Sequence, residues 1–370
     1  MRHRSILLVA IALLALLFSP VAHAGWPSSG RPYPGVPLPP FAWPGQPGNP
    51  VGYAAAPGYP GHLTLFTGTL TSGTSGAHQV YSYQDFNAGT GCTVISGLHY
   101  VDFIGDRFQS NDVENCNVEL YNSDHITFSY TSFTPLASLY TSPPGEAWPS
   151  AGAGLNTTTF VTDVNCINGN SGYEYGVNVV SGGPYTWDHA DFWGFGNAIA
   201  FQNTTASMLI SASWIHDAAN GSPQGYHTDG PGYLNGSLQN PPQNVTVTGS
   251  VIASIGTSNG LAFQAAPTAY VNLVLTNNYL SGFGFQADVG HEIAGSTVTF
   301  TGNTLGTDIA WYFGPIYGDP TSLFTGTNWN TNILNVLPGT APVPGSTFSY
   351  SSADNGKFVY PDSTLHTSDY

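Results

Sequence analysis

The chain has 370 residues, 41% hydrophobic and 13% aromatic, so it can bury a large core and is not a disordered polymer. Only 5 residues are Lys or Arg against 21 Asp or Glu, which gives a net charge of −16. Such an acidic surface repels nucleic acid and anionic membranes, so neither is expected as a partner.

The chain begins with the three parts of a signal peptide. Arg2 and Arg4 are basic, residues 6–18 form an almost continuous apolar run, and the small-residue ending Ala22-His23-Ala24 follows. The apolar run is shorter than the ~20 residues needed to span a bilayer. We therefore expect residues 1–24 to be removed and the mature protein to be secreted, without a membrane span.

A proline-rich segment follows the signal peptide. Residues 25–60 hold 11 of the 28 prolines. Proline removes a backbone donor and fixes φ, which disfavours both helix and sheet. We expect residues 25–61 to form a disordered lead-in. A docking motif for an aromatic-lined groove is the alternative.

From residue 62 onwards, short strings of alternating apolar and polar residues replace the proline-rich composition, and these strings resemble one another. Residues 245–252, 273–280 and 298–305 all read apolar-x-apolar-Thr, then a turn pair, then two residues that resume a strand. Looser copies of this string occur earlier in the chain. In all copies together, the second residue of the turn pair is Asp106, Ser132, Asp191, Ser213, Ser250, Asn278 and Asn303. Most gaps between them lie in the twenties, and the long gap before Asp191 divides if Asn165 marks another copy.

A period in the twenties with strands and no helices predicts a β-solenoid. We therefore predict an all-β protein, a right-handed parallel β-helix of about eight or more coils over residues 62–337. Residues 338–370 would form a C-terminal cap and tail. Turn residues such as Asn should then stack and hydrogen-bond from coil to coil. The competing fold, an antiparallel sandwich, has a shorter repeat and needs hairpin turns between matched strands.

The longest remaining gap, between Ser213 and Ser250, predicts an inserted loop over residues 214–235, where solenoids often bind ligands. Histidines and carboxylates gather there, as acid–base catalysts or Ca²⁺ ligands would. The candidate catalytic residues are His216, Asp217, His227 and Asp229. The candidate substrate-binding residues are Trp214, Tyr226, His189 and Asp191, and the candidate Ca²⁺ ligands are Asp217 and Asp229. The alternative is that these residues only satisfy turn backbone groups.

Two further predictions concern pairing between coils. Cys92 and Cys116 lie one repeat apart, which makes a disulfide between them plausible in an exported protein, with Cys166 a buried thiol. Assumed stacking would also bring further acidic and histidine side chains beside the inserted loop. These are Asp188, Asp288, His291 and Glu292.

We expect the protein to be a monomer.

The chain also resembles a known group of proteins. His227-Thr-Asp-Gly230, the string 271–280 and Phe313-Gly-Pro-Ile-Tyr317 are similar to strings in secreted bacterial right-handed parallel β-helix proteins of the pectate-lyase-like superfamily. The similarity covers roughly residues 62 to 345, as pattern rather than identity. It implies a polysaccharide or cell-wall glycan as the partner.

The superfamily's familiar chemistries are only partly represented. Pectate lyases use Arg or Lys as the base beside Ca²⁺, but Arg107 and Lys357 are far in sequence from the polar cluster. Polygalacturonase-type hydrolases carry several motifs, of which only Thr228-Asp229 has a counterpart here. Two hypotheses follow: an exported polysaccharide lyase or glycoside hydrolase that uses the His/Asp cluster, or a non-catalytic extracellular glycan-binding or structural protein.

Overall fold

The fold was analysed in a computed structural model of the chain. It describes residues 52–89, 93–110, 117–135, 158–162, 165–167, 173–179, 182–193, 195–201, 207–216, 229–233, 243–254, 258–263, 268–289, 296–306, 314–317, 333–335, 343–344, 349–350 and 358–359. The signal peptide, Cys92 and Cys116 lie outside these residues, so the predictions made for them stay predictions. Among the described residues, no helix is long and apolar enough to cross a membrane.

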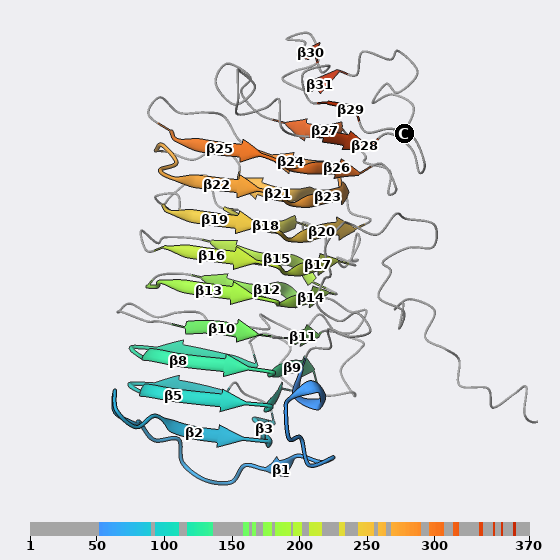
Figure 1. The fold of residues 1–370 in the computed structure, drawn as a ribbon. Coiled ribbons are helices and arrows are strands. Elements are labelled where there is room, and N and C mark those ends of the chain that lie inside the picture. The colour runs from blue at the N-terminus through green and yellow to red at the C-terminus, as the bar shows by residue number, and fades with distance from the viewer. Residues whose placement is uncertain are drawn as a thin grey trace, which may run out of the picture.

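The strands stack into the walls of a parallel β-helix, which confirms the predicted fold class (Figure 1). One wall is a nine-stranded sheet: β2 (Gln79–Ser82), β5 (His99–Ile104), β8 (Asp124–Ser129), β10 (Thr158–Thr162), β13 (Tyr185–Asp188), β16 (Met208–Ser211), β19 (Val245–Thr248), β22 (Leu273–Thr276) and β25 (Val298–Thr301). Every strand pair in this sheet is parallel.

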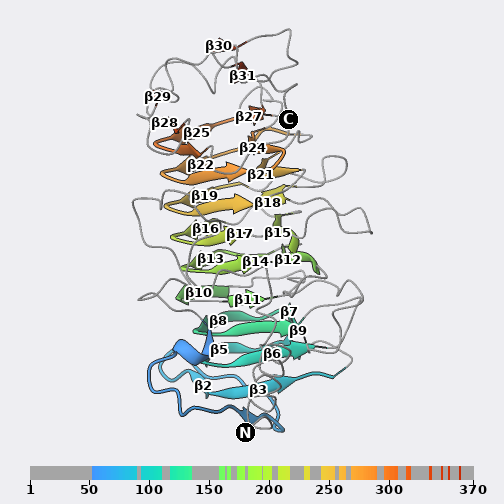
Figure 2. The same ribbon diagram turned by 90° about the vertical axis from the view of Figure 1, so that its right-hand side faces the viewer.

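The second wall, visible beside the first in Figure 2, is a twelve-stranded sheet. Its strands are β1 (Thr64–Leu65), β3 (Gln84–Asn87), β6 (Arg107–Ser110), β9 (Ser132–Pro135), β11 (Asn165–Ile167), β14 (Asp191–Trp193), β17 (Trp214–His216), β20 (Val251–Ser254), β23 (Tyr279–Gly282), β26 (Thr304–Gly306), β28 (Ile333–Asn335) and β29 (Val343–Pro344). Only β29 joins it in antiparallel fashion.

The third wall is a six-stranded parallel sheet: β12 (Tyr173–Val179), β15 (Phe195–Phe201), β18 (Asp229–Tyr233), β21 (Asn259–Phe263), β24 (Phe285–Asp288) and β27 (Gly314–Tyr317). Two small sheets pair β4 (Thr93–Ser96) with β7 (Val118–Tyr121), and β30 (Ser349–Tyr350) with β31 (Phe358–Val359). In the described part of the chain, six coils, from β10–β12 to β25–β27, contribute a strand to all three walls. Coils with all three strands are therefore fewer than the eight or more that the sequence predicted, although the fold class is confirmed.

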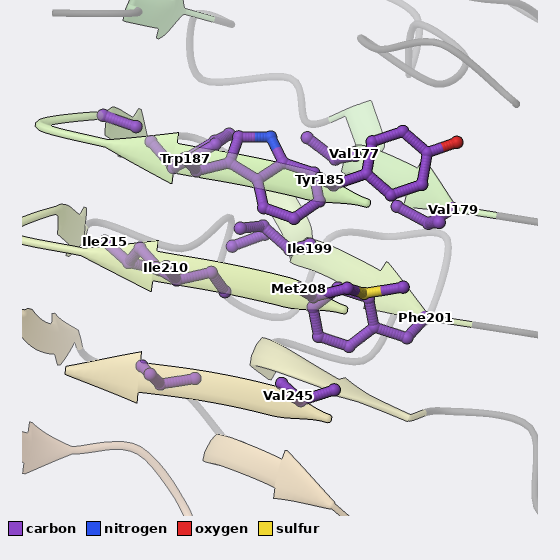
Figure 3. Packing of buried hydrophobic residues seen from close by; sticks show 14 of the residues in the cluster. Val177, Val179, Tyr185, Trp187, Ile199, Phe201, Met208, Ile210, Ile215 and Val245 are labelled. Atoms are coloured by element: carbon purple, nitrogen blue, oxygen red, sulfur yellow. The ribbon is translucent and has the colours of Figure 1, made fainter. Parts of the chain in front are cut away.

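The core fills the space between the walls with large apolar side chains. Alternate residues of each strand point inward, so β13, β16, β19 and β22 all read buried, half-exposed, buried, half-exposed. Figure 3 shows Trp187, Ile210 and Phe201 from three strands directed into the same interior. Aromatic rings also stack from coil to coil, as Phe103 does on Phe128 at 5.0 Å. Burying each such ring contributes roughly 2–3 kcal/mol.

The corner between the nine-stranded and twelve-stranded walls has the same backbone in eight coils. Its first residue has a positive φ in each: Tyr83, Gly105, Tyr130, His189, Ala212, Gly249, Asn277 and Gly302. The second residue is buried in most of these coils, and we name this column the turn ladder: Gln84, Asp106, Thr131, Ala190, Ser213, Ser250, Asn278 and Asn303. In three coils the predicted marker was one residue late. Strand register aligns Asn165 with Ser132 and Asp191, and in the coils of the latter two Thr131 and Ala190 occupy the ladder instead.

Side chains in the turn ladder bond the backbone of the coil before. Asn303 Oδ1 accepts the N–H of Asn278 at 3.0 Å, and Asn278 Oδ1 accepts that of Ser250 at 3.1 Å. The Asn278 amide also donates to the Val247 carbonyl at 2.9 Å. The predicted coil-to-coil hydrogen bonding is therefore confirmed, and it satisfies polar groups that the solenoid buries.

Residues 52–61, at the end of the predicted lead-in, pack on this corner. The short 3-10 helix η1 (Tyr53–Ala55) lies beside β9, where the N–H of Tyr53 donates to Ser132 Oγ at 3.2 Å. Arg107 lies over the Tyr53 ring at 5.5 Å and makes a two-pronged ion pair with Asp85. The proline-rich composition thus extends into a segment that is structured by contacts with the coils.

Candidate functional site

The predicted insertion lies at the corner between the twelve-stranded and six-stranded walls. Strand register aligns Trp193 with His216 and Asn197 with Asp229. In the earlier coil a single residue, 194, separates β14 from β15, whereas residues 217–228 separate β17 from β18. This difference accounts for much of the long sequence gap. Asp217, Tyr226 and His227 fall within 217–228, outside the described residues, so their roles stay predictions.

His216 forms a buried hydrogen-bonded pair with Asp191 on the outer side of the twelve-stranded wall. Ile215 belongs to the core, so its neighbours Trp214 and His216 point outward. His216 Nε2 lies 2.8 Å from Asp191 Oδ1, and the Trp214 ring stacks on the imidazole with centroids 3.5 Å apart. The side chains of His216 and Asp191 are nevertheless only 5% and 7% exposed. An outward-facing His–Asp pair is thus buried.

The same outer surface carries a second apolar cluster. Trp214 packs with Val251, Ala253 and Tyr279, which come from β20 and β23. All four side chains are buried although they lie on the side of the wall away from the main core. Trp214 is therefore buried and not an open platform for a sugar ring in this structure, and its predicted role in substrate binding stays a prediction.

Asp229 lies on the other side of its wall. It shares a face of β18 with Tyr233, a member of the main core. Register places it in a buried polar column between Asn197 and Asn259, and its Oδ1 accepts the N–H of Asn259 at 2.7 Å. His216 and Asp229 therefore occupy opposite sides of the coil wall instead of lining one face.

Metal binding at this corner is not supported by a ligand cluster. Within the described parts of the chain, no group of three or more His, Cys, Asp or Glu side chains could hold a metal ion. Asp217, one of the two candidate Ca²⁺ ligands, lies outside those parts. The Ca²⁺ prediction therefore stays a prediction.

His189 lies at the edge of the nine-stranded wall, on the left-handed corner. Its Nδ1 is 2.8 Å from Asp188 Oδ2, and the Ser211 hydroxyl donates to Asp188 Oδ1 at 2.6 Å. His189 and Asp188 are about one-third exposed. Unlike His216, this pair can be reached by a ligand on the outer surface.

Sequence reasoning missed a polar patch on the first coils of the nine-stranded wall. We name it the N-terminal patch: His78, His99, Tyr100, Asp102, Asp124 and His125. Asp124 lies between two histidines, with Oδ2 2.8 Å from His99 Nδ1 and Oδ1 2.8 Å from His125 Nδ1. Partial burial disfavours the charged carboxylate, but the two histidine hydrogen bonds outweigh it and lower the pKa of Asp124.

The same patch continues to the neighbouring coil. His78 Nδ1 lies 3.0 Å from Asp102 Oδ2, and the Tyr100 ring stacks on His125 at 4.3 Å. The sequence did contain a signal, because His78 and His99 each precede their partner carboxylate by one coil period, 24 and 25 residues. Pairing residues one repeat apart would have found both contacts.

The nine-stranded wall is open on its outer face wherever the structure describes its side chains, which excludes β10. Outward residues of the other eight strands are half-exposed or exposed, whereas outward residues of β17, β20 and β23 are buried. Most of these open positions carry Ser, Thr, Asp or another short side chain. This face therefore offers polar side chains to a ligand in every coil where its exposure is described.

Comparison with known proteins gives no match from which a function could be inferred, so the inference depends on the structure. No protein-family model matches the chain, and no curated protein or solved structure matches it significantly. The fold alone hosts many functions. The choice between binding and catalysis therefore depends on which polar groups are accessible.

Proposed function

We propose that this chain is an exported protein that binds extracellular polysaccharide through the outer face of the nine-stranded wall. One observation carries the proposal: of the three walls, this one alone presents half-exposed or exposed polar side chains in every coil whose outer face the structure describes. Hydroxyl, amide and carboxylate groups on a rigid sheet can hydrogen-bond the hydroxyls of a sugar polymer at little cost in conformational entropy.

Charge and the amino-terminal sequence support this proposal. The basic, apolar and small-residue segments of residues 1–24 favour export, where such polymers occur. With 21 acidic and 5 basic residues, the chain disfavours uronic-acid polymers and favours neutral ones. Membership of the pectate-lyase-like superfamily would fit the same partner class and is part of the proposal.

A glycan array and affinity electrophoresis in gels that contain neutral or uronic-acid polysaccharides test it, each with and without Ca²⁺. We expect retardation by at least one neutral polymer, independent of Ca²⁺. Absence of binding to every neutral polymer would overturn the proposal. A Ca²⁺-dependent preference for polyuronate would also overturn it, because a bridging cation would then be required.

Catalysis is the second candidate, and the His216–Asp191 pair favours it. A carboxylate that fixes an imidazole is the arrangement used to orient a general acid or base. The burial of both side chains argues for a structural role instead, since a polymer must reach its catalyst. His216→Gln separates the two roles: a catalyst variant loses hydrolase or lyase activity at unchanged stability, whereas a structural variant loses stability.

A further inference from the structure

The last four strands of the nine-stranded wall carry no charged side chain on their outer face. We name their outward residues the neutral face: Leu209, Ser211, Thr246, Thr248, Val274, Thr276, Thr299 and Thr301. All eight are half-exposed or exposed. Asp188, in the coil before, is the nearest outward charge along the wall. In a chain this acidic, four successive coils without a charge make a surface suited to an uncharged ligand.

The neutral face is also regular. Register pairs Thr248 with Thr276 and then Thr301 in successive coils, so equivalent side chains repeat every ~4.8 Å along the axis. Within one strand the two outward positions lie about 6.6 Å apart. Thr276 Oγ1 donates to Thr248 Oγ1 at 3.1 Å. β-Branching restricts χ1, so these hydroxyls are held in place before any ligand arrives.

One column of the neutral face alternates in character from coil to coil. It runs Leu209, Thr246, Val274, Thr299, so apolar and hydroxyl side chains follow each other with a period of two coils. A polymer that matches this column must repeat about once per coil. It must also present apolar C–H groups toward this column and hydroxyls toward the threonine column beside it. A β-1,4-linked neutral polysaccharide does so, because it is an extended flat chain with C–H groups on its faces and hydroxyls along its edges.

We infer that the neutral face binds a β-1,4-linked neutral polysaccharide along the axis of the solenoid, with one sugar unit for each coil. This inference rests on the proposed polysaccharide binding and specifies where on the wall it occurs and which linkage is recognised. The C–H faces of the sugars pack on the column of Leu209, Thr246, Val274 and Thr299. Hydroxyls along one edge of the chain bond the neighbouring column of Thr248, Thr276 and Thr301.

The test is isothermal titration of the full mature chain with cellohexaose, xylohexaose and mannohexaose, and with maltohexaose as the α-linked control. We expect binding to at least one β-1,4-linked hexamer and none to maltohexaose. Thr248→Val and Thr276→Val remove a hydroxyl while nearly keeping side-chain shape. Each should weaken binding roughly three- to tenfold, the usual worth of one hydrogen bond. Thr64→Val, at an exposed position of β1 in the twelve-stranded wall, is the matched control and should not change the affinity.

The outcomes distinguish this inference from the broader proposal. If a polysaccharide binds but Thr127→Val or Asp124→Asn weakens it while the two neutral-face variants do not, the N-terminal patch is the site and the inference fails alone. If maltohexaose binds equally well, the linkage is wrong. If no sugar binds and the chain instead inhibits ice recrystallisation, the regular hydroxyl face orders water, and both proposals fail.

Discussion

Replacing Asp106 with asparagine should stabilise the solenoid at neutral pH and remove a large part of its pH dependence. Asp106 is fully buried in the turn ladder, where its Oδ1 accepts the N–H of Gln84 at 2.7 Å. Among the described residues, its Oδ2 has no hydrogen-bond partner. Burial, opposed in part by backbone hydrogen bonds, raises the pKa of this carboxyl from 3.8 to about 7.

The sign of the effect follows from proton binding. Between pH 4 and pH 7 the folded chain keeps a proton on Asp106 that the unfolded chain has released. The free energy of unfolding therefore falls with rising pH, by about 1.4 kcal/mol per unit. Over this shift of roughly three units, the loss is on the order of 4 kcal/mol. It is complete above the folded pKa.

Asparagine avoids this loss because the ladder already accommodates it. Asn278 and Asn303 occupy the equivalent position in later coils. Each donates an amide N–H to the carbonyl that lies three residues before the ladder residue of the previous coil, which is Val247 for Asn278 and Leu275 for Asn303. For position 106 that carbonyl belongs to Tyr81. Asp106→Asn should therefore gain a hydrogen bond and need no proton.

Urea unfolding, followed by tryptophan fluorescence, should be compared for the wild type and Asp106→Asn from pH 4 to pH 8. We expect similar midpoints at pH 4 and a variant that is several kcal/mol more stable at pH 8. Glu119→Gln, at a half-exposed position of β7, controls for the loss of one negative charge. A difference between wild type and Asp106→Asn that stays constant across this pH range would refute the reasoning.

Three further predictions test the ladder, the corner and the N-terminal patch. Asn278→Ala should lower the free energy of unfolding by about 2 kcal/mol, because it leaves buried backbone groups unpaired; equal urea midpoints would contradict this. Gly249→Ala should cost only about 1 kcal/mol for its positive φ. Gly105→Ala should lower the free energy of unfolding by about 1–3 kcal/mol more than Gly249→Ala does, because a Cβ there would lie 2.7 Å from Ala56 Cβ. Similar melting temperatures for the two variants would argue against packing of residues 52–61 on this corner. Asp124→Asn should make stability less sensitive to acid below pH 4, because its lowered pKa makes ionised Asp124 stabilising only above that range; circular dichroism melts at pH 3 and pH 6 measure it.

The fold was predictable because the repeat is imposed on every coil by the same physics. A stacked strand needs alternating inward apolar residues, and the corner needs a residue that tolerates positive φ. Both demands leave a pattern in the sequence at residues 245–252, 273–280 and 298–305. The register errors at Ser132 and Asp191 have a local cause. Their coils carry the bulky Tyr130 and His189 at the positive-φ corner, where the correctly placed coils carry Gly, Ala or Asn, so no small residue or Asn marks the turn.

The candidate site was less predictable because sequence spacing does not say which face of a wall a residue takes. His216 and Asp229 lie 13 positions apart and follow one another across the inserted corner. Strand alternation nevertheless directs one outward and the other toward the core. The contact between His216 and Asp191 spans 25 residues and depends on register, which the off-by-one marker at Asp191 concealed.

The outer face of the nine-stranded wall separates what the fold requires from what it permits. Inward residues such as Trp187 and Ile210, and ladder residues such as Asn278, maintain stacking and would be needed in a solenoid of any function. Outward residues on an uncovered wall contribute little to that stacking, so their chemistry is free to vary. It changes along the axis from paired His and Asp side chains on β5 and β8 to uncharged side chains, mostly hydroxyls, on β16 to β25. Stacking does not demand this change, which is consistent with the proposed binding of a neutral ligand on β16 to β25. The buried His216–Asp191 pair has the opposite property, since burial alone requires that its two polar groups be paired.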